Sequence, residues 1–360
     1  MTEKNKPYTP AIGEEQLTLL EKLSNAIAIS GDEGEIRTII LDEIKTCADD
    51  YVIDAMGNLL VTRKAKVENP LRVMIATHMD EVGFMLVDSD EGGLFRFETV
   101  GGVDPRQLVG KSVLVGKEHI PGVIGARAIH LTTAEERKNA IPLDNLRIDL
   151  GPEGDKKAKP GDRAGFATRF FRSGPSVIGK AFDNRLGVAT LIELVKHAPE
   201  NIELLAAFTV QEEIGLRGAN VAAYRLNPDL AFVIDSTPAH DLPVWDGSEN
   251  TQFNVRLDAG PAIYTADGVT LSDPRLIGHL TRTGDAMGIP YQFRQPGGGG
   301  TDGGAIHKRR AGIPTVSVSV PGRYAHTAVL VARIADWQNT YALVYYALER
   351  LNRNIFDLER

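Results

Sequence analysis

The distribution of apolar and polar residues predicts helices and strands at the start of the chain. Residues 14–29 and 34–47 carry apolar side chains at spacings of three and four positions, which is typical of amphipathic helices. Residues 51–54 and 58–62 flank a Met-Gly turn and predict a β-hairpin. Residues 71–77 form a continuous apolar run, which favours a strand covered by helices on both faces.

The pattern changes in the middle of the chain, where short strand-like runs replace the helical periodicity. These runs, separated by Gly, Pro and charged turns, occupy residues 94–100, 112–116, 122–126, 146–150 and 162–167. Helices (184–197, 274–287, 335–351) then alternate with strands (202–211, 230–235, 315–320). We therefore predict an α/β protein with a three-layer α/β/α core from residues 1–87 and 168–360, and an inserted small all-β, barrel-like domain at residues 88–167.

Composition and charge restrict the class of protein further. The 360 residues are 42% apolar and carry a formal net charge of −8 without a basic run, which argues against nucleic-acid binding. The longest stretches without a charged residue have twelve residues, too short for a membrane-spanning helix of about 20. The single cysteine, Cys47, excludes an internal disulfide and a cysteine metal cluster. Because residues 1–10 are polar and lack the apolar region of a secretory signal, we expect a cytoplasmic protein.

Candidate chemistry lies at the ends of the predicted strands or at the helix starts that follow them, which is where α/β sheets place their active sites. The polar features found there are His78 with Asp80, Asp183, Glu212 with Glu213, Asp235, and His326. Each one alone has an ordinary explanation as a helix cap, an exposed acidic turn or a hydrogen-bonded histidine. Their occurrence at equivalent places in the sheet is what indicates a common site.

The residue types in this set are those of a site for two metal ions. Two histidines, two terminal carboxylates and one bridging carboxylate, together with a shared water, provide each ion with four ligands, the usual minimum for zinc. The terminal ligands are His78, His326, Glu213 and Asp235, and the bridging ligand is Asp183. Mixed nitrogen and oxygen ligation without sulfur suits two divalent ions, Zn²⁺ or Co²⁺, and Mn²⁺ as well.

Two further acids are expected to act beside the ligands. Asp80 follows His78 by two positions and shares its face in an extended strand, so its carboxylate can accept the imidazole N–H and orient the ring. Glu212 and Glu213 are neighbours whose side chains diverge at a strand end, so one can bind a metal ion while the other faces the bound water. Without a cation, two carboxylates this close would repel each other.

The chain resembles the M42 family of metallo-aminopeptidases, which includes glutamyl aminopeptidase and the tetrahedral TET peptidases. The matching segments run in the family's order and are ATHMDEVG (76–83), GKAFDNR (179–185), QEEIG (211–215), VID (233–235), GGTD (299–302) and PGRYAH (321–326). The resemblance implies that one metal ion is held by His78, Asp183 and Asp235. It implies that the other is held by Asp183, Glu213 and His326.

The resemblance also implies a reaction and an assembly. Glu212 would be the general base that activates a water shared by the two metal ions, and Asp80 would support His78. The substrates would be peptides with a free N-terminus, and the chain would form homo-oligomers, from a dimer up to a tetrahedral dodecamer, with the β domain at the contacts. Thr327-Ala328 and residues 236–240 depart from the family pattern on the substrate side, so the preferred N-terminal residue does not follow.

The glycine-rich segment 297–304 permits a close approach of the backbone, so we expect it to line the substrate cleft. Gly300, Thr301 and Asp302 are candidate substrate contacts, although stabilisation of the turn explains Thr301 and Asp302 equally well. Two other functions stay open. One is a di-metal carboxypeptidase or amide deacylase of the same architecture, which usually carries a ferredoxin-like lid in place of an all-β insertion. The other is a non-catalytic assembly protein, which should have lost at least one of the site residues.

Overall fold

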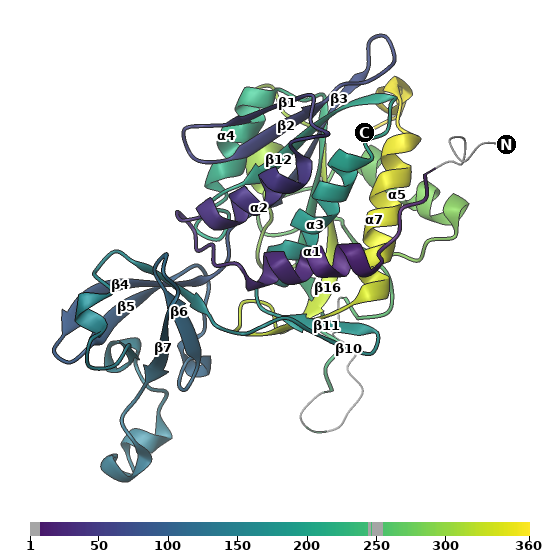
Figure 1. Cartoon of the computed structure of the whole chain (residues 1–360). Coiled ribbons are helices and arrows are strands. Elements are labelled where there is room, and N and C mark those ends of the chain that lie inside the picture. The colour runs from purple at the N-terminus through teal and green to yellow at the C-terminus, as the bar shows by residue number, and fades with distance from the viewer. Residues whose placement is uncertain (1–7, 244–245, 247–254) are drawn as a thin grey trace.

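The computed structural model describes residues 8–243, 246 and 255–360, so residues 1–7 of the predicted core domain lie outside the described residues. Figure 1 shows a larger α/β body with a smaller barrel beside it. In the described part of the chain, no helix is both long and apolar enough to cross a membrane.

The predicted helices form at the expected places, with different ends. The helices of the described residues are α1 (Glu14–Asn25), α2 (Gly34–Ile44), α3 (Phe182–Lys196), α4 (Arg217–Leu226), α5 (Pro274–Met287), α6 (Gly303–Ile306) and α7 (Ile334–Glu349). Helix α1 ends before the predicted residue 29, because Ala26 adopts an extended conformation and Ile29 forms a parallel bridge with Glu81. Helices α4 and α6 were not predicted from the sequence.

The strands of the larger body form one mixed sheet. They are β1 (Asp50–Ile53), β2 (Leu59–Arg63), β3 (Leu71–His78), β10 (Phe171–Ser173), β11 (Ser176–Gly179), β12 (Ile202–Thr209), β13 (Leu230–Pro238), β14 (Ala262–Tyr264), β15 (Gln292–Arg294), β16 (Thr315–Arg323) and β17 (Leu330–Arg333). The order is β1-β2-β12-β3-β13-β16-β17-β11-β10, and β14 pairs with β15 and β16. The central strands β12, β3, β13 and β16 are parallel, so their C-terminal ends lie at one edge.

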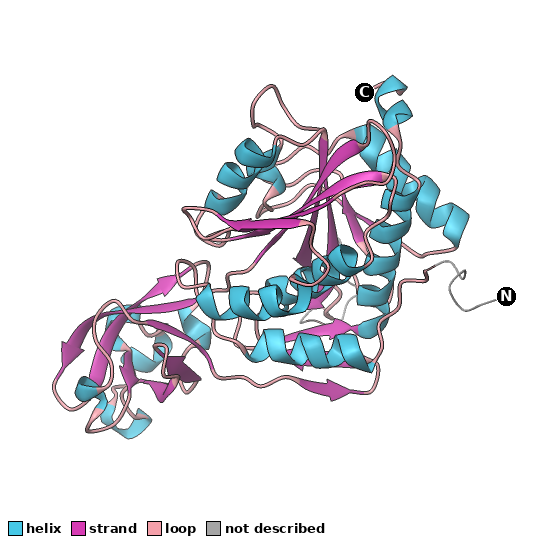
Figure 2. Cartoon of the chain, turned by 45° about the horizontal axis from the view of Figure 1, so that its top comes forward, coloured by secondary structure: helices cyan, strands magenta, loops and turns pink. Residues whose placement is uncertain are grey.

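Helices cover both faces of this sheet, as Figure 2 shows. Val73 and Ile75 of β3 pack into the core shared with α1, α2, α3 and α7, while Met74 and Ala76 pack into the core shared with α4 and α6. Successive strand residues point to opposite faces, so an uninterrupted apolar strand serves both cores. The three-layer α/β/α fold predicted from the sequence is thus confirmed.

The inserted segment folds as a closed barrel. Its strands β4 (Gly83–Asp90), β5 (Leu94–Val100), β6 (Ser112–Val115), β7 (Ile120–Gly125), β8 (Arg147–Asp149) and β9 (Arg163–Phe166) close in the order β4-β5-β8-β7-β6-β9. Its own apolar core includes Phe84, Phe95 and Ile148. Between β7 and β8 an arm of short 3₁₀ helices leaves the barrel and exposes Ile129 and Leu131 (Figure 1).

Candidate functional site

The structure brings the predicted ligands together at the C-terminal edge of the parallel strands. The apolar run of β3 buries its strand in the centre of the sheet and thereby places the polar residue that ends it at this edge. The ligands come from different elements: His78 ends β3, Asp235 lies in β13, Asp183 lies at the start of α3, Glu213 follows β12, and His326 lies between β16 and β17.

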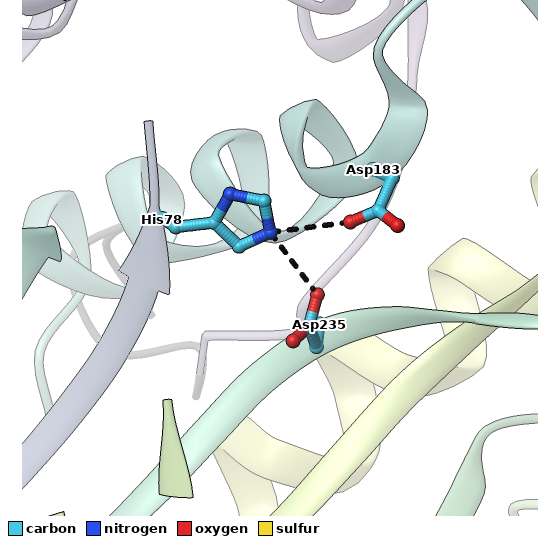
Figure 3. A group of neighbouring side chains, drawn as sticks. All are labelled: His78, Asp183 and Asp235. Atoms are coloured by element: carbon cyan, nitrogen blue, oxygen red, sulfur yellow. Dashed lines mark hydrogen bonds and ion pairs between the residues drawn. The ribbon is translucent and has the colours of Figure 1, made fainter. Parts of the chain in front are cut away.

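The first cluster consists of His78, Asp183 and Asp235 (Figure 3). The imidazole Nε2 of His78 lies 3.1 Å from Oδ1 of Asp183 and 3.5 Å from Oδ1 of Asp235. The other ring nitrogen, Nδ1, lies 3.1 Å from the main-chain oxygen of Asp80. A proton on Nδ1 therefore satisfies that carbonyl and leaves a lone pair on Nε2 facing the two carboxylates.

The second cluster consists of Asp183, Glu213 and His326. Nε2 of His326 lies 3.5 Å from Oδ2 of Asp183 and 3.8 Å from Oε2 of Glu213. Asp183 thus directs one carboxylate oxygen to the first histidine and the other oxygen to the second. This is the arrangement that a bridging carboxylate requires.

The spacing and chemistry of these atoms fit divalent metal ions. Zinc bonds to nitrogen and oxygen of about 2.0–2.2 Å in a tetrahedron separate neighbouring ligand atoms by about 3.3–3.6 Å. The four histidine–carboxylate separations lie between 3.1 and 3.8 Å. The donors are imidazole nitrogens and carboxylate oxygens, a set that suits Zn²⁺, Co²⁺ and Mn²⁺.

Three acids of the site, Glu212, Glu213 and Asp235, carry raised pKa values because they are buried beside other carboxylates. The pKa of Asp183 is lowered instead, because its hydrogen bonds to His326 and His78 outweigh its burial. Burial raises the pKa of Glu213 to about 8 and that of Asp235 to about 6, and in both cases the Asp183 carboxylate adds to the shift. Burial also raises the pKa of Glu212 well above its ordinary value. The hydrogen bond to Asp183 raises the pKa of His326 to about 10. In the protein without metal, protons balance the clustered negative charge, which is the role that divalent cations fill when bound.

The Asp80 carboxylate holds the turn that carries the two glutamates. It accepts hydrogen bonds from the backbone N–H groups of Glu212 (3.0 Å) and Glu213 (3.2 Å), and from the hydroxyl of Ser30 (2.5 Å). Its nearest approach to the His78 ring, at Nδ1, is 3.5 Å. Asp80 therefore connects the first histidine to the glutamate turn. Ser30 was not predicted to belong to the site, because a serine just beyond a predicted helix carries no signal for this contact.

A buried ion cluster supports the same region and was also missed. Both carboxylate oxygens of Glu81 lie 2.8 Å from Nζ of Lys180, and one lies 3.0 Å from the guanidinium of Arg185. The three side chains are at most 3% exposed. They link the β3–β4 connection to the start of α3, where Asp183 lies. The available signal was that all three charged residues lie within two of the segments that resemble the family, ATHMDEVG (76–83) and GKAFDNR (179–185).

The candidate substrate contacts differ in accessibility. Gly300 is exposed, whereas Thr301 and Asp302 are buried. The hydroxyl of Thr301 lies 2.8 Å from that of Ser317, and Oδ2 of Asp302 accepts a hydrogen bond of 2.5 Å from Thr209. Burial raises the pKa of Asp302 to about 7.

Comparisons with known proteins place the chain in a family. The model for the M42 glutamyl aminopeptidase family matches residues 57–343. The glutamyl aminopeptidase of Lactococcus lactis subsp. cremoris (strain MG1363) is 31% identical over 348 residues, which cover 92% of this chain and 96% of that protein. The lysyl aminopeptidase of Pyrococcus furiosus is 29% identical over 345 residues, again 92% and 96% of the two chains.

A solved structure agrees with these relatives. The Pyrococcus horikoshii TET1 peptidase, which can assemble into a tetrahedron or a large octahedral shell, has a TM-score of 0.83 and 34% identity, over 93% of this chain and all of that chain. The chain therefore belongs to the M42 family and is an aminopeptidase, an enzyme that hydrolyses peptide bonds.

Proposed function

We propose that the chain is a di-metal aminopeptidase that removes the N-terminal residue of peptides, with Glu212 as its general base. The observation that carries the proposal is the position of the Asp183 carboxylate, which has one oxygen near each of the two site histidines. One ion would be held by His78, Asp183 and Asp235, and the other by Asp183, Glu213 and His326. When bound, two divalent ions would supply Lewis-acid polarisation of the scissile carbonyl and would lower the pKa of the attacking water.

The remaining chemistry is assigned to side chains of the chain itself. The Glu212 carboxylate takes the proton of the attacking water and returns it to the leaving amine, a contribution of roughly 10²- to 10⁴-fold in rate. Asp80 keeps Glu212 in place through the hydrogen bond to its backbone N–H. The free α-amino group of the substrate would bind one metal ion or a nearby carboxylate, which would make the enzyme an exopeptidase.

The test is hydrolysis of a panel of aminoacyl-p-nitroanilides, with N-acetylated analogues, by the wild type and Glu212→Gln. Glu200→Gln, whose carboxylate lies on the surface, is the matched control. Metal content and activity are measured before and after chelation and after addition of Zn²⁺, Co²⁺ or Mn²⁺. We expect Glu212→Gln to retain two ions per subunit while kcat falls by about 10²- to 10⁴-fold.

Each other outcome points to a different function. Cleavage that survives N-acetylation contradicts an exopeptidase. Absence of cleavage with two ions bound favours a di-metal carboxypeptidase or amide deacylase, although the all-β insertion argues against that architecture. Absence of bound metal favours a non-catalytic assembly protein. The panel also identifies the preferred N-terminal residue, since two relatives of similar overall identity are named for opposite charges, glutamyl and lysyl.

We further propose that the chain forms homo-oligomers, as the Pyrococcus horikoshii TET1 peptidase does. The predicted insertion, residues 88–167, would form subunit contacts and one wall of the cleft together with the first residues of β4 (Gly83–Asp90). The rest of residues 1–87 with residues 168–360 would form the catalytic domain. The exposed apolar side chains of the barrel arm, Ile129 and Leu131, support a role in contacts. Light scattering of the purified protein distinguishes a dimer from a dodecamer. A cytoplasmic location and the absence of nucleic-acid or membrane partners stay predictions from the sequence.

A further inference from the structure

The barrel approaches the candidate metal centre at the turn Gly101-Gly102, which follows β5. The main-chain oxygen of Gly102 lies 2.9 Å from Nδ1 of His326, across 224 residues of sequence. The preceding Gly101 packs against the second glutamate: a β-carbon added to Gly101 would lie 3.3 Å from Cβ of Glu213. Two of the three residues of the second cluster therefore lie against this turn.

The two clusters differ in what orients their histidines. His78 is 2% exposed, at the end of a central strand, and its Nδ1 lies beside the main-chain oxygen of Asp80, two residues away. His326 is 41% exposed and has a φ of +57°, a conformation that non-glycine residues rarely adopt. The hydrogen-bond partner of the His326 Nδ1 belongs to the inserted segment rather than to the sheet.

We propose that Gly102 is a positioning residue for the second metal ion. Its carbonyl oxygen accepts the Nδ1–H of His326, which keeps the lone pair on Nε2 and directs it at Asp183 and Glu213. The absence of a side chain at position 102 leaves room for the ring. The barrel thereby sets the affinity of the second ion and leaves the first ion unaffected. This inference rests on the proposed di-metal function.

Gly102→Ala tests the contact without removing a ligand. Gly102 does not have a positive φ, so alanine can adopt its backbone conformation. The added β-carbon would lie 3.2 Å from Nδ1 and 3.7 Å from Cε1 of His326, so the ring must move by a few tenths of an ångström. Gly125→Ala is the matched control, because Gly125 lies in the same barrel, also lacks a positive φ, and has only the oxygen of Arg147, at 4.0 Å, near its added β-carbon.

The experiment is a two-step Zn²⁺ titration of the chelated full-length protein, in competition with a chromogenic chelator, at fixed protein concentration. The step that is lost in His326→Ala defines the second ion. We expect Gly102→Ala to raise the Kd of that step by about 10-fold or more, since disturbing the group that orients a metal ligand typically costs about 10- to 100-fold in metal affinity. The first step should stay within about twofold, Gly125→Ala should match the wild type at both steps, and Gly102→Ala should have no further effect in the His326→Ala protein.

The outcomes separate this inference from the proposed function. A wild-type protein that binds no Zn²⁺ refutes the proposed function, and the inference with it. Two normal binding steps in Gly102→Ala refute the inference alone, because the added methyl group then leaves the second site intact. Equal weakening of both steps also refutes it, because the effect is then a general disturbance, which a lower unfolding temperature would reveal.

Discussion

Replacing Glu81 with glutamine should destabilise the protein strongly, although the glutamine side chain has nearly the same shape as the glutamate side chain. Glu81 accepts hydrogen bonds from Lys180 (2.8 Å), Arg185 (3.0 Å) and the backbone N–H of Ala28 (2.9 Å). Lys180 also donates to the carbonyl of Ala26, and Arg185 to that of Leu23, so the cluster joins the end of α1 to the start of α3. Glutamine removes the only acidic member and leaves two buried cations facing each other.

The loss of stability in Glu81→Gln is limited because Lys180 can release its proton. Breaking a buried ion pair by removing one partner costs about 3–5 kcal/mol. Burial, aided by the charge of Arg185, already lowers the pKa of Lys180, and loss of Glu81 lowers it further. Lys180 can therefore become neutral, which avoids the cost of an unpaired buried charge. Removing its proton costs about 4.6 kcal/mol at pH 7 for an ordinary pKa near 10.4. We expect a loss of about 3–5 kcal/mol at pH 7.

The stability of Glu81→Gln should also depend on pH. In Glu81→Gln the folded-state pKa of Lys180 lies below its unfolded value, so the unfolded chain binds the extra proton and stability rises with pH. Since removal of the proton costs only about 1.9 kcal/mol at pH 9, the difference from the wild type should narrow by about 2–3 kcal/mol between pH 7 and pH 9.

Urea unfolding measures the free energy of unfolding of the wild type and Glu81→Gln at each pH. Protein and metal concentrations are kept fixed, because both shift apparent stability. The matched control is Glu200→Gln, which removes an ion pair to Lys66 whose two side chains are 65% and 71% exposed. That control should change stability by less than about 1 kcal/mol. A loss in Glu81→Gln as small as in the control, or a deficit that does not narrow with pH, would refute the reasoning.

Two further predictions concern the site. Ser30→Ala removes the hydroxyl donor from Asp80 and should lower kcat about tenfold with both ions retained; steady-state kinetics with metal analysis checks this, and an unchanged kcat contradicts it. In metal-free protein, burial raises the pKa of Glu213 to about 8 and of Asp235 to about 6. Folding then binds protons, so stability should fall between about pH 4 and pH 8, as unfolding curves would show. Metal-loaded protein, whose acids stay ionised, should lack this slope.

Local sequence pattern predicted most of the long elements, although it missed α4 and β4, and it predicted the short elements poorly. Apolar runs such as β3 and amphipathic helices such as α5 were predicted because their patterns extend over eight or more neighbouring residues. The strands β14 (Ala262–Tyr264) and β15 (Gln292–Arg294) have three residues each and were missed, since so short a run has no period. They form because β14 pairs with β16 in the antiparallel direction and β15 pairs with β14 in the parallel direction.

The sequence by itself determined which residue types end the central strands. It placed His78 after an apolar strand, Asp235 at the end of another and two glutamates after a third, and the motif resemblance assigned metal roles to His78, Asp235 and Glu213. These statements depend on neighbours within a few positions, which a sequence records directly.

Only the tertiary structure decided how these residues meet. The order β2-β12-β3-β13-β16 brings together strands that are far apart in the chain. Packing of α3 and the barrel against this sheet places the two oxygens of Asp183 near different histidines and the main-chain oxygen of Gly102 beside His326. It also encloses Glu81 between two cations. Such contacts arise from packing between distant segments, and no spacing along the chain encodes them.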